Sequence, residues 1–373
     1  SPFEVAALFL FYEFFGMVTN LFGGWLAART GLNTTLHIGL ALQMLALGML
    51  LVDTAWLSVF YVMAAQALSG IAKDLNKMSA KSSIKLLLPE NAQGKLYHWV
   101  ALLTGSKNTL KGVGFFIGAL LLSSIGFRAA ILFLFCGLMV VCITSFLLID
   151  RGMGKSQYQP KFRELFSKSP AINRLSAARF FLFGSRDIWF VVALPVYLQS
   201  VLGWSYTAVG SLLALWIIAY GAVQSIAPKL TQRGQSKSPN GKTALHWVLP
   251  LCLIPAAIAA ALHYTLAEPA TVLMIGLAVY GIIFAINSSL HSYLIVAYAQ
   301  RDGVSLDVGF YYMANAAGRL TGSLLSGLIY QWQGLEACML ASSAFIAVAC
   351  TLSTGLAKYQ PQTLELESTA TPG

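Results

Sequence analysis

Long apolar stretches recur along the whole chain, and short polar segments separate them. A helix needs about 20 mostly apolar residues to cross the hydrocarbon core of a bilayer. Eleven stretches reach this length, and they predict membrane helices over residues 3–28, 34–54, 56–80, 97–124, 128–149, 175–200, 206–229, 244–264, 270–299, 304–330 and 335–357.

The composition supports this interpretation. Hydrophobic residues make up 57% of the 373 residues and charged residues only 10%, whereas a soluble domain carries about 25% charged residues. The sequence therefore predicts an all-α, multi-pass protein of the inner (plasma) membrane, with the lipid bilayer as its solvent. The net charge of +10 does not indicate nucleic acid binding, because no basic–aromatic stripe or DNA-reading motif accompanies it.

The distribution of Lys and Arg between the two ends of the predicted helices gives their orientation. Sixteen of these residues lie at one set of alternate ends, from Arg29 to Lys358, and only Arg128 lies at the other set. Because positive charge is retained in cytoplasmic loops, we expect Ser1 outside and the C-terminal tail in the cytoplasm.

An internal repeat suggests how the helices are grouped. The segment that begins at Ser1 matches the segment that begins at Ser205, but a whole predicted helix, 175–200, precedes only the second copy. We therefore expect a twelve-helix protein whose first helix is missing from this chain. The expected parts are an N-terminal bundle (1–149), a basic linker (150–174), a C-terminal bundle (175–357) and a cytoplasmic tail (358–373).

Charged residues within the predicted helices are the candidates for function, because a charge at membrane depth costs several kcal/mol unless it faces a cavity or a partner. Cations outnumber acids there, which favours an anionic substrate. The predicted substrate-binding residues are Lys73, Lys107, Lys111, Arg186, Asn315 and Arg319, and the predicted proton-coupling residues are Glu13, Asp74 and Asp187. Each Asp lies beside a cation and can pair with it or with a cation on another helix.

Four lysines, Lys73, Lys77, Lys81 and Lys85, recur every four residues and so share one helical face. They span about 18 Å at 1.5 Å per residue. The deep Lys73 is expected in the cavity, whereas Lys81 and Lys85 are expected to reach solvent at the cytoplasmic mouth.

Charges are absent from the hydrophobic interiors of four predicted helices, 34–54, 128–149, 244–264 and 335–357. This alternation of charged and uncharged helices resembles that of the major facilitator superfamily. In that family these four helices lie at the back, and the others line a cavity between two six-helix bundles. Gly24, Arg29 and Gly31 match the family's loop signature, although Ala28 stands where Asp is usual. The resemblance implies the major facilitator fold and secondary transport.

The segment from Ser69 to Lys85 and the segment from Gly105 to Gly112 look like those of the ArsJ-type organoarsenical efflux permeases. This resemblance implies export of 1-arseno-3-phosphoglycerate, arsenate resistance, and a functional link to the glyceraldehyde-3-phosphate dehydrogenase that forms this cargo. It supplies no binding residues.

Other features narrow the alternatives. The five cysteines lie in three of the four uncharged helices, 128–149, 244–264 and 335–357, so a soft, thiol-binding cargo is not expected. No phosphate-binding loop, metal motif or catalytic constellation occurs, so no cofactor, metal or enzyme activity is predicted. A transporter of another organic anion or drug remains an alternative, and a membrane enzyme or receptor is a weaker one.

Overall fold

A computed structural model describes residues 2–89, 92–149, 153–155, 160–166, 168–232 and 238–359, and it gives no side-chain environment for residues 2–13. None of the described residues forms a β-strand. The α-helices are α1 (Pro2–Thr30), α2 (Leu32–Met49), α3 (Val59–Leu87), α4 (Gln93–Leu148), α5 (Pro170–Phe190), α6 (Ala193–Ser200), α7 (Tyr206–Thr231), α8 (Gly241–His263), α9 (Pro269–Tyr298) and α10 (Val304–Thr354). Three short 3-10 helices, Thr54–Trp56, Phe162–Leu165 and Gly355–Lys358, lie between or after them.

The all-α membrane architecture is confirmed, but the number of separate helices differs from eleven. Two pairs of predicted helices each run on as one element, α4 and α10, which turn at Gly126 and Gly334. These glycines have φ of 76° and 73°, a left-handed conformation that costs glycine little. A single glycine therefore replaces each predicted loop. Seven stretches of the described residues are long and apolar enough to cross a membrane.

The predicted helix 175–200 differs in both its start and its continuity. It begins earlier, at Pro170, because Ser169 caps the helix by accepting a 3.4 Å hydrogen bond from the backbone N–H of Ile172. It is also interrupted between α5 and α6. Pro195, near the start of α6, has no N–H for a helical bond and its ring disfavours helix through the residue four positions earlier, Val191.

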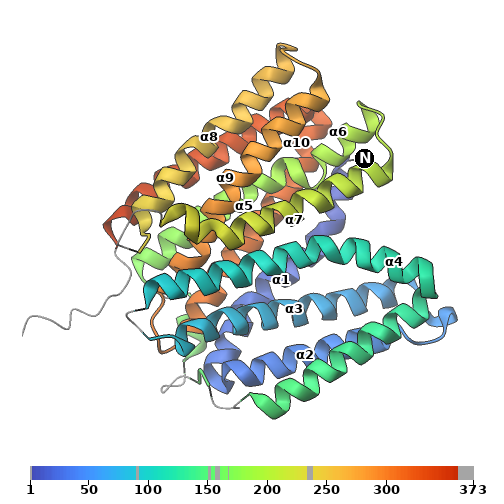
Figure 1. Ribbon diagram of the computed structural model, residues 1–373, viewed down its shortest axis with the longest axis vertical. Coiled ribbons are helices and arrows are strands. Elements are labelled where there is room, and N and C mark those ends of the chain that lie inside the picture. The colour runs from blue at the N-terminus through green and yellow to red at the C-terminus, as the bar shows by residue number, and fades with distance from the viewer. Residues whose placement is uncertain are drawn as a thin grey trace, which may run out of the picture.

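The helices form two groups that meet along two seams. In Figure 1, α2, α3 and α4 lie together in the lower part of the view, and α5 to α10 lie in the upper part. The groups meet where α1 packs on α10 and where α4 packs on α7. At both seams glycines allow close approach: a Cβ on Gly24 of α1 would lie 3.1 Å from the Cα of Gly309 of α10.

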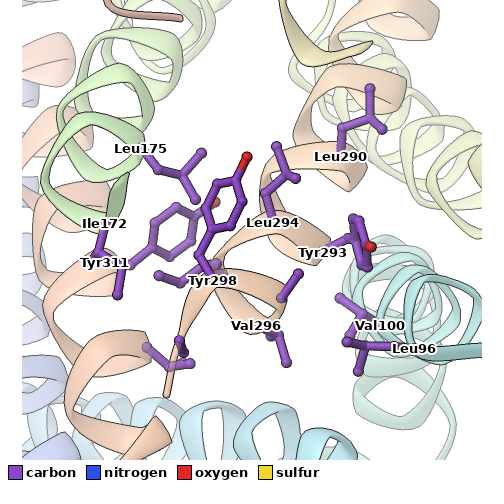
Figure 2. Close-up of a cluster of buried hydrophobic side chains, with 14 of the residues drawn as sticks. Leu96, Val100, Ile172, Leu175, Leu290, Tyr293, Leu294, Val296, Tyr298 and Tyr311 are labelled. Atoms are coloured by element: carbon purple, nitrogen blue, oxygen red, sulfur yellow. The ribbon is translucent and has the colours of Figure 1, made fainter. Parts of the chain in front are cut away.

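One hydrophobic core joins the two groups near one end of the helices. Figure 2 shows this cluster, in which Leu96 and Val100 of α4 lie beside Tyr293 of α9, and Leu175 of α5 lies near Tyr311 of α10. All five residues are fully or almost fully buried. The core fills the space between the helices at this end, so any cavity between the groups must lie beyond it.

Candidate functional site

A cavity of about 470 Å³ lies between α3 and α4 on one side and α5 and α10 on the other. Among the described residues, eight cationic side chains and one carboxylate line it. The charged lining residues are Lys73, Asp74, Lys77, Lys81, Lys107, Lys111, Arg179, Arg186 and Arg319. Such a concentration of positive charge attracts anions strongly, because the surrounding protein and membrane screen it poorly.

The structure brings together all six residues predicted to bind substrate, since Lys73, Lys107, Lys111, Arg186, Asn315 and Arg319 all line this cavity. The three lysines have exposed side chains, so their ammonium groups are accessible to a ligand. Of the proton-coupling candidates, Asp74 lines the cavity and Asp187 lies behind it. The side chain of Glu13 lies outside the described residues.

The lysines form one wall, on α3 and α4. Asp74 accepts a 2.6 Å hydrogen bond from Lys77, three residues along α3, so the carboxylate pairs within its own helix. The Nζ of Lys77 also lies 4.2 Å from the ring centre of Tyr312 on α10, a cation–π distance. Asp74 is the one carboxylate among the described lining residues, so the five lysines of this wall carry more positive charge than it can offset.

Lys81 does not reach solvent, contrary to the expectation from the sequence. Its side chain is only 2% exposed, lines the cavity and donates a 2.8 Å hydrogen bond to Oγ1 of Thr104 on α4. The four-residue spacing predicted its helical face correctly. The prediction was wrong about depth. The hydrophobic core lies between Lys81 and the nearer end of the bundle, so this side chain faces the cavity and not the solvent.

The arginines form the opposite wall, and Asp187 holds two of them. Arg186 donates through Nε to Oδ1 of Asp187 at 2.7 Å and also contacts it through Nη2. Arg319 of α10 donates through Nε to Oδ2 at 3.0 Å. The carboxylate is completely buried, so each oxygen is shielded from water by an arginine. Both guanidinium groups also line the cavity, where they can meet a ligand.

Arg179 is a cavity residue that was not among the predicted binding residues. It is 3% exposed and donates to Oδ1 of Asn315 at 2.8 Å and to Oγ of Ser288 at 3.1 Å. Its guanidinium carbon lies 3.7 Å from the ring centre of Phe183. Arg179 therefore orients Asn315 while contributing charge. Its spacing of seven residues from Arg186, two helical turns, was the available sequence signal.

Neutral polar side chains complete the lining and connect the two groups of helices. Asn108 of α4 donates a 2.6 Å hydrogen bond to Oε1 of Gln224 on α7. Gln224 donates in turn to Ser288 of α9 at 3.1 Å, and the Tyr220 hydroxyl donates to the same serine at 2.9 Å. This network holds this part of the cavity lining in place, because each member is hydrogen-bonded to at least one other.

The cavity is closed at the end where α3 finishes and α9 finishes. Lys85 of α3 donates to the backbone carbonyls of Val296 at 2.7 Å, Ala297 at 3.2 Å and Ala299. These carbonyls end α9, where the helix dipole is negative. Arg301 donates in return to the carbonyl of Leu86 at the end of α3, at 3.2 Å. Lys85, expected in solvent, instead joins the two groups of helices.

The loop signature at the end of α1 takes part in the same closure. Ser305 of α10 donates to the carbonyl of Gly24 at 2.9 Å, and Trp25 donates through its indole N–H to the carbonyl of Pro160 at 3.0 Å. Arg29 lies over the ring of Trp25 at 4.8 Å. Ala28 stands where the family signature usually has Asp, and the contacts named here are hydrogen bonds and a cation–π contact.

Among the described residues, no thiol lines the cavity. The described residues contain no cluster of three or more His, Cys, Asp or Glu side chains that could hold a metal ion. The five cysteines, Cys136, Cys142, Cys252, Cys338 and Cys350, all lie away from the cavity lining, and Cys338 is buried. The polar groups that a ligand meets are therefore ammonium, guanidinium, amide and hydroxyl groups and the single carboxylate of Asp74.

Comparisons with known proteins identify the architecture. The family model of the Major Facilitator Superfamily matches residues 1–245 and 175–370. No curated protein matches the sequence. Among solved structures, the human organic anion transporter MFSD10 superposes with a TM-score of 0.73 at 15% identity, over 94% of this chain and 83% of that one. A bacterial homologue of the iron transporter ferroportin, in an outward-facing state, gives 0.69 at 16% identity, over 95% and 91%.

The proton:xylose symporter XylE gives a TM-score of 0.71 at 13% identity, over 92% of this chain and 84% of that one. At these identities the structural likeness establishes the fold alone. The family match extends over nearly the whole sequence, so the chain belongs to the Major Facilitator Superfamily and is a multi-pass membrane transporter of small molecules.

Proposed function

We propose that this protein exports a doubly anionic organoarsenical, 1-arseno-3-phosphoglycerate, from the cytoplasm across the inner membrane and thereby confers arsenate resistance. One observation carries the anionic part of the proposal: eight cations against one carboxylate line the cavity. The resemblance of the segments around Lys73 and Lys107 to organoarsenical permeases supplies the arsenical. The geometry of the cavity is compatible with such a cargo in two respects.

The first respect is the presence of two different cationic walls. Lysines on α3 and α4 face arginines on α5 and α10 across the cavity. A cargo with an oxyanion at each end, a phosphate and an arsenate ester, can contact both walls at once. Arginine binds such groups in a bidentate manner, and lysine binds them as a mobile point charge. A ligand that joins the two walls also joins the two groups of helices.

The second respect is the chemistry of the donors. Pentavalent arsenate esters are hard oxyanions, which ammonium and guanidinium groups bind as they bind phosphate. Trivalent arsenic would require thiolates, and the cysteines lie outside the lining of this cavity. The lining thus favours the oxidised ester over arsenite.

Proton coupling is the driving force that we propose, with Asp74 as the carrier. Two of the three proton-coupling candidates have described side chains. Asp74 lines the cavity, and Asp187 is enclosed by two arginines. Cargo that binds Lys77 competes with its bond to Asp74. When cargo takes Lys77 away from Asp74, the released carboxylate can accept a proton. Protonation of Asp74 therefore depends on whether cargo occupies the cavity. Glu13 remains a further candidate.

The experiment uses cells that lack their own arsenate export and express this protein with or without a glyceraldehyde-3-phosphate dehydrogenase. We expect arsenate resistance only when both proteins are present, because the dehydrogenase forms the cargo. Lys107→Gln should abolish most of this resistance, whereas Lys229→Gln, which changes an exposed lysine outside the cavity, should preserve it. Arsenate resistance that appears without the dehydrogenase contradicts the proposal. Absence of resistance when both proteins are expressed also contradicts it.

A further inference from the structure

A second pocket, of about 780 Å³, adjoins the cationic cavity on the side away from the closed end. The two spaces share five lining residues, Asn108, Lys111, Arg186, Tyr220 and Arg319. Three of these are cations, so one side of the second pocket is positively charged. Residues near the beginnings of α3 and α7, among them Gln66 and Thr207, mark its outer part.

Aromatic side chains also line this second pocket. Phe115 and Phe116 of α4, Phe190 of α5 and Trp216 of α7 all line it, and they are called the aromatic wall below. The ring centres of Phe190 and Trp216 are 5.0 Å apart, and Trp216 stacks on Tyr220 at 5.6 Å with an interplanar angle of 5°. A 2.9 Å hydrogen bond from the Trp216 indole N–H to the carbonyl of Leu277 fixes this ring. The rings of Phe190 and Trp216 are therefore held in place by their neighbours.

The proposed cargo leaves this aromatic wall without a role. A phosphoglycerate ester is polar along its whole length, so it gains nothing from contact with Phe115, which is 60% exposed. An aromatic ring that covers such a surface is stabilised by loss of water from both faces and by ring–ring contact. A fixed aromatic wall beside Lys111, Arg186 and Arg319 matches a ligand with a ring and an adjacent anion.

We propose that this second pocket binds small aryl oxyanions, molecules in which one aromatic ring carries one phosphonate, arsonate or carboxylate group. The ring lies against Phe115, Phe190 and Trp216, and the oxyanion lies on Lys111 and Arg319. Because both cations also line the inner cavity, an aryl oxyanion excludes cargo from them and acts as a competitive inhibitor. This binding depends on the geometry of the pocket and not on the identity of the transported cargo.

The test is titration calorimetry of the purified protein with phenylphosphonate and with methylphosphonate, which has the same head group and no ring. We expect phenylphosphonate to bind about tenfold more tightly, the scale that burial of one ring gives. Phe115→Ser and Phe116→Ser, which change exposed side chains, should each lower this preference several-fold without weakening methylphosphonate. Phe133→Ser, an equally exposed position of α4 outside both pockets, should leave both affinities unchanged.

Lys111→Gln provides the second arm, because it should weaken both phosphonates to a similar degree. Equal affinities of the two phosphonates for the unmodified protein overturn the proposal, as does a phenyl preference that both phenylalanine variants retain in full. Binding that does not respond to Lys111→Gln also overturns it. None of these outcomes depends on arsenical export, so failure here is distinguishable from failure of the proposed function.

Discussion

Nε of Arg319 lies 3.0 Å from Oδ2 of Asp187 and donates a hydrogen bond to it, which ties α10 to α5 across 132 residues of sequence. Arg186 occupies the other oxygen of the same carboxylate. Asp187 is completely buried, whereas both arginines reach the cavity and the second pocket. The carboxylate therefore positions two cations for a ligand without itself being accessible to that ligand.

Asp187→Asn should impair both stability and transport. The change keeps the shape of the side chain but leaves two partly buried arginines without their counter-charge, and breaking such a pair costs about 3–5 kcal/mol. We expect a clear fall in the thermal unfolding temperature of the purified protein and loss of most transport. Glu336→Gln, which removes an exposed acid paired with His263, is the matched control and should change neither. A fully active, equally stable Asp187→Asn protein would exclude the positioning role.

Neutralising single cavity lysines should weaken anion recognition without unfolding the protein. Lys73, Lys107 and Lys111 have exposed side chains in the cavity, and a charge-assisted hydrogen bond contributes about 1.5–3 kcal/mol. Each change to Gln should therefore raise the apparent KM for an anionic cargo by about tenfold or more. Unchanged KM in all three variants, with protein amounts equal to those of Lys229→Gln, would show that cargo binds elsewhere.

Lys85→Met should open the closed end of the cavity. The change removes hydrogen bonds to three carbonyls at the end of α9 and keeps a long apolar side chain. The probe is a cysteine at Ala80, a lining residue, in a protein otherwise free of cysteine. A membrane-impermeant thiol reagent added from the end that contains Lys85 should modify it about tenfold faster in the variant, which corresponds to about 1.4 kcal/mol.

Lys95→Met is the control for this measurement, because Lys95 is exposed on α4 near the same end. It should leave the rate of modification unchanged. If both variants react at the unmodified rate, the contacts of Lys85 do not hold this end closed.

Replacement of all five cysteines by alanine should leave transport largely intact. None of them lines the described cavity, so no thiol is expected to contact cargo. Some loss of stability is expected from the buried Cys338, because a large-to-small change in a core leaves a cavity. Transport of the arsenate ester that vanishes in a well-expressed cysteine-free protein would indicate a thiol-dependent mechanism instead.

The sequence predicted the general architecture well, for physical reasons that act over short distances. Apolar length determines which segments cross a bilayer, and the four-residue spacing of Lys73, Lys77 and Lys81 places them on one face of α3. The cost of burying charge indicated that Arg186 and Arg319 would face a common space. These inferences need only a local pattern and the knowledge that the solvent is lipid.

Other features depend on contacts that no local pattern encodes. Nothing near Asp187 in the sequence indicates that Arg319 approaches it from α10. The lengths of the helices do not show that Gly126, one of 32 glycines, forms a complete turn. The depth of Lys81 and the partners of Lys85 depend on which end of the bundle is closed, which is a property of the conformation. The contact between Phe190 of α5 and Trp216 of α7 likewise joins residues that are distant from any common local pattern.

Uptake of arsenic into everted membrane vesicles that contain this protein tests the proposed function most directly. The outer medium supplies arsenate, glyceraldehyde-3-phosphate, NAD and the purified dehydrogenase, so that 1-arseno-3-phosphoglycerate forms at the cytoplasmic face. We predict arsenic accumulation that stops when any one of these four components is omitted and that falls at least about tenfold in Lys107→Gln. Arsenic accumulation from arsenate alone would contradict the proposed function. So would accumulation no higher than that of vesicles without the protein when all four components are present.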